Sequence, residues 1–434
     1  MTGRELPRTL VADLPTRLGA AVRVCGWVRE NSPCAATPIV VLGDHTGLAH
    51  LVAEHDGRLE DVMAGLVRES AIEVVGTAQR APDGSTRVVV ADLHVAGPAE
   101  APLPIDEQSP PEQRLDWRHL DLRRPGNRLI FEVQTTAERA MRAFWAEQGF
   151  IEVHSPKLRP TPNKSGDQLF AVDYFGGRAY LAQSPQFYKQ MAMAAGFDRV
   201  FEIGPVFRQQ PQPTSRHDTE FTSVDIEMAW IGSEDELLAH EEEMLRRVIA
   251  AVQAAHADEV MRCFATELRV PSTPFPRVTL AEAKEIVAAT GWPAGPADDD
   301  LDAEGERRLA EYVARTHGHE FVFVTHYPEP SRPFYHMRCD EDSVQSRSFD
   351  LLWNGLEITS GAQREHRYDR LVAQAEARGI PIDLIGGYLD FFRFGCPPHG
   401  GFGLGLTRML MSMLEVPDVR EVTYLFRGPD RLTP

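Results

Sequence analysis

Short segments in which apolar and polar residues alternate fill the chain from about residue 20 to residue 96. Turn signals separate them, among them the Asp-His-Thr-Gly of residues 44–47 and the Pro-Asp-Gly of residues 82–84. Alternation with a period of two is typical of strands that bury one face, and five or so short strands in this length predict a small β-barrel of the OB type. We assign residues 1–97 to this domain.

A proline-rich stretch follows the predicted barrel. It begins at Gly97-Pro98 and contains four further prolines, Pro102, Pro104, Pro110 and Pro111. Proline-rich segments are extended and stiff, so residues 98–125 are predicted to form a hinge or linker between domains.

The remaining residues, 126–434, mix helical and strand patterns. Apolar residues recur at three- and four-residue steps over 126–149, and further helices are predicted near 235–257, 280–290, 303–317 and 366–379 and from about Leu406. Strand-like runs occupy 150–153, 199–203, 221–227 and 349–352. Runs of strands with long helical insertions are typical of an α+β domain built on a mostly antiparallel sheet.

Composition narrows the class of protein. The chain has 434 residues, more than one core supports, and a formal net charge of −19. That charge argues against a protein that coats nucleic acid, although tRNA contact needs only a local basic stripe. No apolar run approaches the ~20 residues that cross a bilayer, and the N-terminus resembles no signal or transit peptide, so a cytoplasmic enzyme without membrane contact is expected. The five cysteines form no CxxC pair, which predicts reduced thiols.

Two basic motifs could grip phosphates. The strand-like Val206-Phe207-Arg208 is followed by a polar loop and by Ser215-Arg216-His217, and guanidinium forks match phosphate oxygens. Near the C-terminus, the Gly-rich run 402–405 leads into Thr407 and Arg408, and glycines allow close approach of backbone to a ligand. Taken alone, each motif could also be an ordinary hairpin or tight turn.

A pair of carboxylates lies between these motifs. Asp350 and Glu357 occupy two strand-like pieces joined by Trp353-Asn354, so both could face one cleft. Mg²⁺ prefers one or two carboxylates together with substrate oxygens, which fits a phosphate-gripping loop nearby. Surface charges on a hairpin are the alternative.

In order and spacing, these segments resemble motifs 2 and 3 of the class II aminoacyl-tRNA synthetases, with the acidic strand between them. Residues 126–156 resemble motif 1, the dimer-forming helix and strand. The runs 181–190 (LAQSPQFYKQ), 355–364 and 397–405 (PPHGGFGLG) are similar to those of the archaeal-type aspartyl-tRNA synthetases, and the resemblance covers nearly the whole chain. It implies an OB-fold domain followed by a class II catalytic domain, with ATP and Mg²⁺ as cofactors and a homodimer as the assembly.

The resemblance also implies roles for individual residues. Arg208 would hold the α-phosphate of ATP, Arg216 and His217 the outer phosphates, and Phe221 and Arg408 would sandwich adenine. Asp350 and Glu357 would carry Mg²⁺, and Arg208, Glu357 and Arg408 would support catalysis. The substrate-binding residues would be Gln186, Lys189, Asp225, Ser360 and Arg364, with Lys189 and Arg364 on the side-chain carboxylate and Asp225 facing the amino group.

Lys189 and Arg364 favour an acid over its amide. The asparagine enzymes of the family have an apolar residue where this chain has Lys189, and an amide would leave the two buried cations unpaired. The substrate carboxylate would attack the α-phosphorus directly, with rate enhancement from positioning and charge neutralisation.

Several positions depart from the family pattern. Where members carry Thr-Glu-Gly-Gly in a mobile loop, this chain has Asn163-Lys164-Ser165-Gly166, and a lysine would repel the substrate ammonium. Motif 2 has Gln210 for a glutamate that lies near adenine, a change that ATP binding tolerates, and motif 3 has Thr407 for an acidic residue.

The barrel also departs from the family pattern. A base-stacking Phe, an Arg and a Gln of the family are replaced by Ile39, Gly43 and His50. The loss of the aromatic face and the cation puts anticodon reading in doubt.

Three functions are consistent with these residues. The first is an aspartate–tRNA ligase, either specific for the aspartate tRNA or relaxed enough to charge the tRNAs for aspartate and asparagine. The second is a paralogue that makes an adenylate of aspartate or a related acid for a non-tRNA acceptor, or for inhibitor resistance. The third is a catalytically inactive binding protein that senses an amino acid or RNA. The intact Arg208, Glu357 and Arg408 favour an enzyme.

Overall fold

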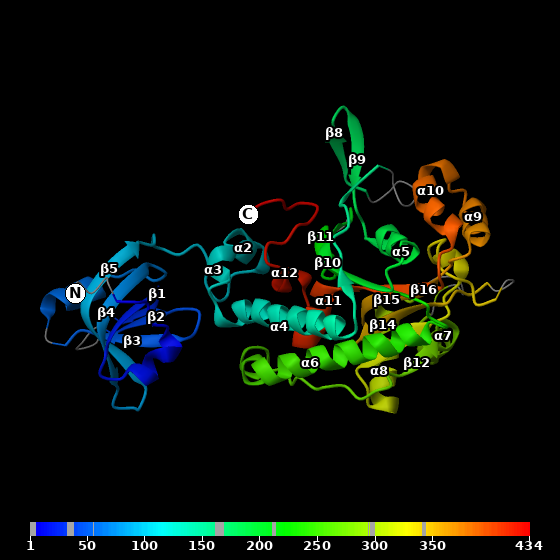
Figure 1. Ribbon diagram of the computed structural model, residues 1–434. Helices are drawn as coiled ribbons and strands as arrows, with labels where there is room; N and C mark the ends of the chain where they lie inside the picture. Colours follow the sequence, from blue (N-terminus) through cyan, green and yellow to red (C-terminus); the bar gives the residue numbers. More distant parts are fainter. Residues whose placement is uncertain are drawn as a thin grey trace. The chain divides into compact units, whose positions relative to one another are not determined.

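A computed structural model describes residues 6–32, 39–54, 56–160, 169–210, 214–293, 295, 300–340 and 344–434. The chain divides into two compact units, Met1–Asp121 and Leu122–Pro434 (Figure 1). The proline-rich stretch up to residue 121 therefore groups with the first unit. Among the described residues, no helix has both the length and the apolar character needed to cross a bilayer.

The first unit is a closed five-stranded barrel with the strand order β1-β2-β3-β5-β4. Its strands are β1 (Ala21–Ser32), β2 (Ile39–Gly43), β3 (Leu48–Val52), β4 (Ala71–Arg80) and β5 (Thr86–Gly97). Neighbouring strands are antiparallel except β3 and β5, whose parallel pairing closes the barrel. Every strand gains partners on both sides, so no sheet edge is left open. The structure confirms the small barrel that the alternating sequence predicts.

Alternate residues of the strands point into the barrel and form its core. Val24, Leu42, Leu51 and Val74 are completely buried there. A short 3₁₀ helix (Val11–Arg17) and α1 (Gly57–Ala64) contribute Leu14 and Met63 to the same core. After the barrel, the chain forms two short helices, α2 (Pro111–Asp116) and α3 (Arg118–Asp121).

The second unit is built on an eight-stranded sheet of order β12-β13-β14-β15-β16-β11-β10-β6. Its strands are β6 (Ile151–Glu152), β10 (Arg199–Phe207), β11 (Glu220–Ala229), β12 (Arg277–Thr279), β13 (Phe321–Thr325), β14 (Ser348–Trp353), β15 (Leu356–Arg364) and β16 (His399–Gly405). All pairs are antiparallel except the two outermost, β12 with β13 and β10 with β6. This topology confirms the predicted α+β domain.

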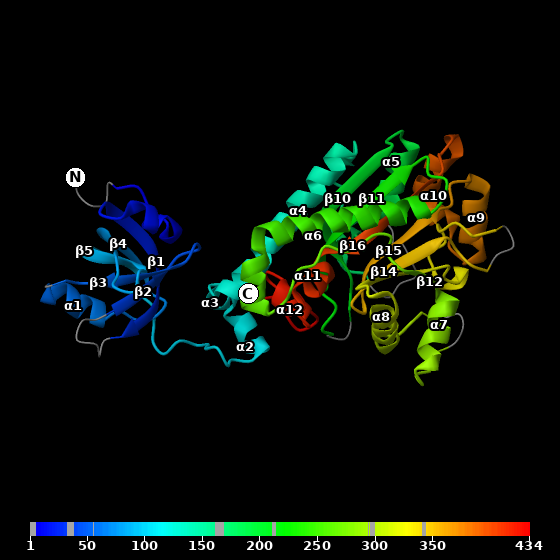
Figure 2. The same cartoon turned by 90° about the horizontal axis from the view of Figure 1, so that it is seen from below.

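Helices cover both faces of this sheet. On one face, α4 (Pro125–Glu147) and α6 (Asp235–Phe264) pack side by side, and α11 (Leu406–Leu414) contacts β11 and β15 (Figures 1 and 2). The fully buried Trp145 of α4 lies 4.8 Å from the ring of Phe201 on β10 and donates a hydrogen bond to His240 of α6. On the opposite face lies α5 (Gln186–Ala194).

The remaining elements border the sheet. A small three-stranded sheet contains β7 (Leu158–Arg159), β8 (Ala171–Tyr174) and β9 (Gly177–Leu181). The other helices are α7 (Leu280–Ala289), α8 (Ala303–His317), α9 (Tyr368–Ala377), α10 (Ile382–Leu389), α12 (Val419–Val422) and the 3₁₀ segments Glu329–Ser331 and Asp390–Phe394. The predicted helices near 280–290, 303–317 and 366–379 correspond to α7, α8 and α9. Helices α5 and α10 were not predicted.

The register of the central strands decides which side chains share the α5 face. Asp225 of β11 lies opposite Gly403 of β16, Gly403 lies opposite Ser360 of β15, and Ser360 lies opposite Asp350 of β14. Side chains two residues apart on a strand point to the same face, so Ser223 and Glu227 join Asp225 there. Gly403 has no side chain to fill the space between Asp225 and Ser360, and a hollow with polar walls results.

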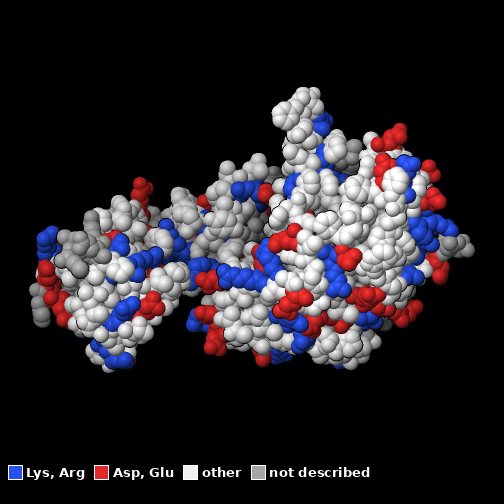
Figure 3. Space-filling model, viewed as in Figure 1, with Lys and Arg blue, Asp and Glu red and all other residues white. Residues whose placement is uncertain are grey.

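Surface charge is mixed in sign. Figure 3 shows lysines and arginines interspersed with acidic residues over the visible face of each unit. The net charge of −19 is therefore not concentrated in one acidic patch on this face.

One carboxyl group is buried in the helix layer without an ion-pair partner among the described residues. Glu241 of α6 is fully buried, and neither carboxyl oxygen has a hydrogen-bond partner among the described residues. Burial, reinforced by the charges of Glu242 and Asp350 and opposed by the hydroxyl of Thr359, raises the pKa of Glu241 to about 8. Glu241 is therefore protonated at neutral pH.

This protonation makes stability depend on pH. Between about pH 4.3, where an unfolded glutamate titrates, and about pH 8, the folded state holds a proton that the unfolded state has lost. The free energy of unfolding therefore falls as pH rises through this window, and the contribution of Glu241 between pH 6 and pH 8 is about 2 kcal/mol. Glu241→Gln keeps the shape without titrating, so it should stabilise the chain more at pH 8 than at pH 6.

Urea unfolding followed by circular dichroism at both pH values measures this difference. Glu243→Gln is the matched control, because hydrogen bonds from Arg246 and Arg247 lower the pKa of Glu243 and keep it ionised throughout the range. A stability difference between wild type and Glu241→Gln that is equal at pH 6 and pH 8 would contradict the interpretation.

Candidate functional site

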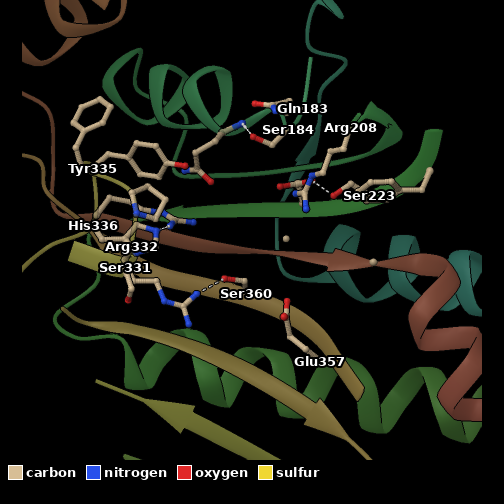
Figure 4. Close-up of a pocket in the computed structure, with 18 of the residues that line it drawn as sticks. Gln183, Ser184, Arg208, Ser223, Ser331, Arg332, Tyr335, His336, Glu357 and Ser360 are labelled. Carbon is tan, nitrogen blue, oxygen red and sulfur yellow. Dashed lines mark hydrogen bonds between the residues drawn. The ribbon is translucent and has the colours of Figure 1, made fainter. Parts of the chain in front are cut away.

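A cleft of about 840 Å³ opens on the α5 face of the large sheet. Its walls come from the start of α5, the strands β11, β15 and β16, the β10–β11 hairpin, the start of α11 and residues 330–336 (Figure 4). Of the predicted site residues, it is lined by Gln186, Arg208, Arg216, His217, Phe221, Asp225, Glu357, Ser360, Arg364 and Arg408. Residues as far apart in the sequence as Gln186 and Arg408 thus meet in one cavity.

Three arginines converge at one end of the cleft. Arg208 follows β10 directly, and its guanidinium carbon lies 5.3 Å from the centre of the Phe221 ring. The side chain is open to the cleft, yet the surrounding protein and the charge of Arg408 lower the pKa of Arg208. Arg216 forms an ion pair of 2.7 Å with Glu306. These guanidinium groups form a positive field that suits a polyphosphate.

Backbone and ring acceptors hold Arg408 in place. Its Nη1 donates to the carbonyl oxygen of Glu357 at 2.9 Å, and its Nη2 lies 3.0 Å from Nε2 of His217. Burial and the neighbouring cations, Arg408 foremost, lower the pKa of His217 to about 4. His217 is therefore neutral near pH 7, and its Nε2 accepts from Arg408 while Nδ1 is paired with the Thr214 hydroxyl. His217 thus orients a cation and adds no charge of its own.

Glu357 and Asp350 differ in their surroundings. Burial and the charge of Asp350 raise the pKa of Glu357 to about 7, although Nη1 of Arg408 lies 3.7 Å from its Oε1. The buried Asp350 forms a two-pronged ion pair with Arg332, in which Nη1 lies 3.1 Å from Oδ1. Among the described residues no cluster of three or more metal-ligating side chains occurs.

Lys189 lies behind the other end of the cleft and does not line it. Its ammonium donates to Asp225 Oδ1 at 2.9 Å, to the Phe402 carbonyl at 2.9 Å and to the Ile226 carbonyl at 3.2 Å. An ammonium has three donors, so all are in use. The structure therefore places Lys189 as the counter-ion of Asp225.

Arg364 is also buried, but it borders the cleft. Nε donates to Glu227 at 3.1 Å, Nη2 to the Gly401 carbonyl at 2.7 Å, and Nη1 lies 2.8 Å from His336 Nε2. Glu227 also lies 3.5 Å from the Lys189 ammonium. Lys189, Asp225, Glu227 and Arg364 thus form a buried group with two charges of each sign.

Gln186 and Ser360 complete the walls at this end. Gln186 is hydrogen-bonded to Gln190 at 3.1 Å, and Ser360 lies 3.4 Å from Arg332 Nη1. Gln210 and Thr407, which depart from the family pattern, both line the cleft. The segment 163–166 with Lys164, which carries the other departure, lies outside the described residues.

Sequence reasoning did not identify several side chains of this wall. Ser331, Arg332, Tyr335 and His336 come from the connection between β13 and β14 (Figure 4). A connection between strands has no regular apolar period, so the sequence did not indicate that these residues line the site. For Glu227 the sequence did contain a signal. Glu227 lies two residues after Asp225 on the same strand and therefore on the same face.

The barrel positions that depart from the family pattern lie on β2 and β3. The Cγ and Cδ atoms of Arg29 fill the space beside Gly43 where a side chain would stand, and Arg29 is paired with Glu69 at 2.8 Å. Ile39 is exposed, and His50 lies on β3. Ile39 offers no aromatic face for a base to stack on, and of these three positions only His50 carries a ring.

Comparison with known proteins agrees with this geometry. The family model "tRNA synthetases class II (D, K and N)" matches residues 110–427. The chain is 37% identical to the aspartate–tRNA(Asp/Asn) ligase of Aeropyrum pernix, over 98% of each chain. It is 38% identical to the aspartate–tRNA(Asp) ligase of Pyrococcus horikoshii, over 96% of this chain and 97% of the relative.

Solved structures show the same architecture. The asparaginyl-tRNA synthetase of Pyrococcus horikoshii, complexed with asparaginyl-adenylate, superimposes with a TM-score of 0.91 at 30% identity, covering 99% of this chain and 100% of the other. The aspartyl-tRNA synthetase of Entamoeba histolytica gives a TM-score of 0.88 at 29% identity, covering 99% and 93%. The resemblance drawn from the sequence is confirmed. This chain belongs to the class II tRNA synthetases of the D, K and N group.

Proposed function

We propose that this protein activates aspartate with ATP to aspartyl-adenylate and transfers the aspartyl group to tRNA. The observation that carries the proposal is one cleft with unbalanced positive charge at one end and a charge-balanced polar pocket at the other. A triphosphate suits the first end and a small zwitterion the second. Relatives at 37–40% identity over nearly the full length are named as aspartate–tRNA ligases.

The chemistry requires no protein nucleophile. An oxygen of the substrate α-carboxylate attacks the α-phosphorus, the bond to the bridging oxygen breaks, and pyrophosphate leaves with that electron pair. Arg208 would neutralise charge on the α-phosphate, and Arg216 would hold the outer phosphates. Arg408 and Phe221 would enclose adenine, with His217 orienting Arg408. Charge neutralisation by groups already in place lowers the barrier without a reorganisation cost.

Of the two carboxylates predicted to hold Mg²⁺, Glu357 lines the cleft and Asp350 does not. Glu357, with its raised pKa, is the stronger candidate ligand, and Asp350 is shared with Arg332. Glu357 would hold the ion, and a bound Mg²⁺ would supply neutralisation of phosphate charge.

The charge-balanced end of the cleft would bind the amino acid. Asp225 would accept the substrate ammonium, Gln186 and Ser360 would contact its polar groups, and Arg364 would face the side-chain carboxylate. Lys189 would act by keeping Asp225 in place and by adding positive potential behind the pocket. A homodimer formed through residues 126–156 and a cytoplasmic location accompany this proposal.

The transfer step is expected to discriminate weakly between tRNAs. Arg29 covers the position beside Gly43, and Ile39 stands where the family has a ring whose stacking on a base is worth about 1–3 kcal/mol. Relatives of both kinds, aspartate–tRNA(Asp) and aspartate–tRNA(Asp/Asn) ligases, occur at similar identity.

Substitution of Arg208 tests the activation step. Arg208→Gln removes charge stabilisation at the α-phosphate, so aspartate-dependent ATP–pyrophosphate exchange should fall by about 10²–10³-fold. Arg393→Gln, an exposed arginine paired with Asp390 outside the cleft, is the control and should leave exchange unchanged. Equal exchange rates in wild type and Arg208→Gln would refute the assigned role.

Charging assays with transcripts test the transfer step. We expect aspartylation of the aspartate and asparagine tRNA transcripts with kcat/KM values within about tenfold of each other. The reason is that the stacking energy of one anticodon base, which the family's ring at position 39 would supply, is missing here. A phenylalanine tRNA transcript is the negative control. Discrimination above a hundredfold would contradict weak reading by the barrel. Exchange without charging of any transcript would favour a non-tRNA acceptor.

A further inference from the structure

A buried cation beside the cleft has no charged partner. Arg159 ends β7, and only 6% of the residue is exposed. Its Nε has no hydrogen-bond partner, and among the described residues no carboxylate lies within ion-pair distance of its guanidinium. Burial of an unpaired charge destabilises a fold, so a buried guanidinium is normally surrounded by acceptors or by an opposite charge. Arg159 therefore has donor capacity that the protein itself does not use.

Aromatic side chains stand where a counter-ion would be expected. The guanidinium carbon of Arg159 lies 5.0 Å from the centre of the Phe187 ring and 5.6 Å from that of Tyr188. Ring faces attract a cation without carrying a negative charge, so they offset only part of the cost of taking it out of water. Burial lowers the pKa of Arg159, while the phenols of Tyr188 and Tyr335 oppose this shift. The Tyr188 hydroxyl can accept from one of the five guanidinium donors, which leaves most of them unused.

The same corner of the fold contains a helix N-terminus. Phe187 and Tyr188 belong to the first turn of α5, which begins at Gln186 and has no side-chain cap. The first N–H groups of a helix have no intrahelical acceptor and carry partial positive charge. A guanidinium beside this turn adds positive charge to positive charge. An anion is the group that both features favour.

This corner adjoins the amino-acid end of the cleft. Ser184, two residues before α5, and Tyr335 both border the cleft (Figure 4). The charge of Arg159 acts on the phenol of Tyr335, yet Arg159 itself does not line the cleft. A ligand of Arg159 would thus lie next to the amino acid without occupying its place.

We propose that Arg159 and the first turn of α5 form a binding site for a small oxyanion, of the size of a carboxylate or a phosphate, in addition to the sites for ATP and the amino acid. Rings pack against the guanidinium, so the donors along its edge are the ones left for a ligand. That edge matches two oxygens of a carboxylate or a phosphate. The inference does not depend on which amino acid the cleft activates.

Thermal unfolding of the full-length chain tests the proposal. Arg159→Met keeps a long side chain against the two rings and removes the charge. In sodium chloride alone, this variant should unfold at the wild-type temperature or higher, because an apolar group replaces a buried unpaired charge. Arg199→Met is the matched control, since Arg199 also lies near a ring, that of Phe150, but donates to the carbonyl oxygen of Gln148.

The probes are sodium phosphate and sodium acetate at about 50 mM, each compared with sodium chloride at equal ionic strength. The unfolding midpoint of the wild type should rise at least about 2 °C more than that of Arg159→Met, because a ligand stabilises only the protein that binds it. Arg208, Arg216 and Arg408 are present in both proteins, so their response to phosphate cancels in this difference. A response to phosphate alone identifies a phosphate group as the ligand, and a response to acetate identifies a carboxylate.

Equal gains from both probes in the wild type and in Arg159→Met would overturn the inference. Combined with a lower midpoint of the variant in chloride, that result would make Arg159 a clamp between β7 and α5. An equal loss of the gain in Arg199→Met would contradict it as well. Arg159→Lys keeps the charge but loses the planar fork, so it should lose at least about half of the gain, and it replaces Arg159→Met in the comparison if the latter does not fold.

Discussion

Charge pairing on one face of the large sheet is the constraint on which the site depends. Lys189, Asp225, Glu227 and Arg364 are all buried there. An ionised side chain taken out of water destabilises the fold by several kcal/mol unless an opposite charge and further hydrogen bonds surround it. Each of the four has an opposite charge beside it, with Asp225 between Lys189 and Ser223, and Glu227 between Lys189 and Arg364, although Oε2 of Glu227 has no hydrogen-bond partner among the described residues. The pairing fixes side chains on three elements, α5, β11 and β15, in one arrangement before any ligand arrives.

The sequence predicted the framework of this arrangement better than its contacts. Alternating strands, the α4 helix and the positions of Arg208, Arg216 and Arg408 follow from patterns within a few residues of one another. The partner of Lys189 does not, because Lys189 and Asp225 lie on a helix and a strand whose packing is tertiary. For the same reason Arg332 was not predicted as a site residue, because its contacts Asp350 and Ser360 are 18 and 28 residues away in the sequence.

The barrel illustrates a different limit. Gly43 reads in the sequence as the loss of a cation, but the structure shows the space beside it filled by Arg29, whose charge is bound to Glu69. The neighbouring strand β1 places the guanidinium of Arg29 near this position, but that guanidinium is engaged in an ion pair with Glu69. The fold of the barrel was predictable from alternation alone, whereas the chemistry of its surface depends on cross-strand neighbours that alternation does not identify.

The two ends of the cleft therefore bind by different physics. At the phosphate end, Arg208 has no carboxylate within ion-pair distance among the described residues, and its pKa is lowered by its surroundings and by Arg408, so an anionic ligand relieves repulsion already present. At the amino-acid end the protein charges cancel, and a zwitterion gains only from the geometry of donors and acceptors. Affinity for the nucleotide should thus fall with ionic strength, while selection of the amino acid depends on the positions of the hydrogen-bond donors and acceptors around Asp225 and Arg364. Such a division lets ATP bind through charge while specificity is set by hydrogen bonds.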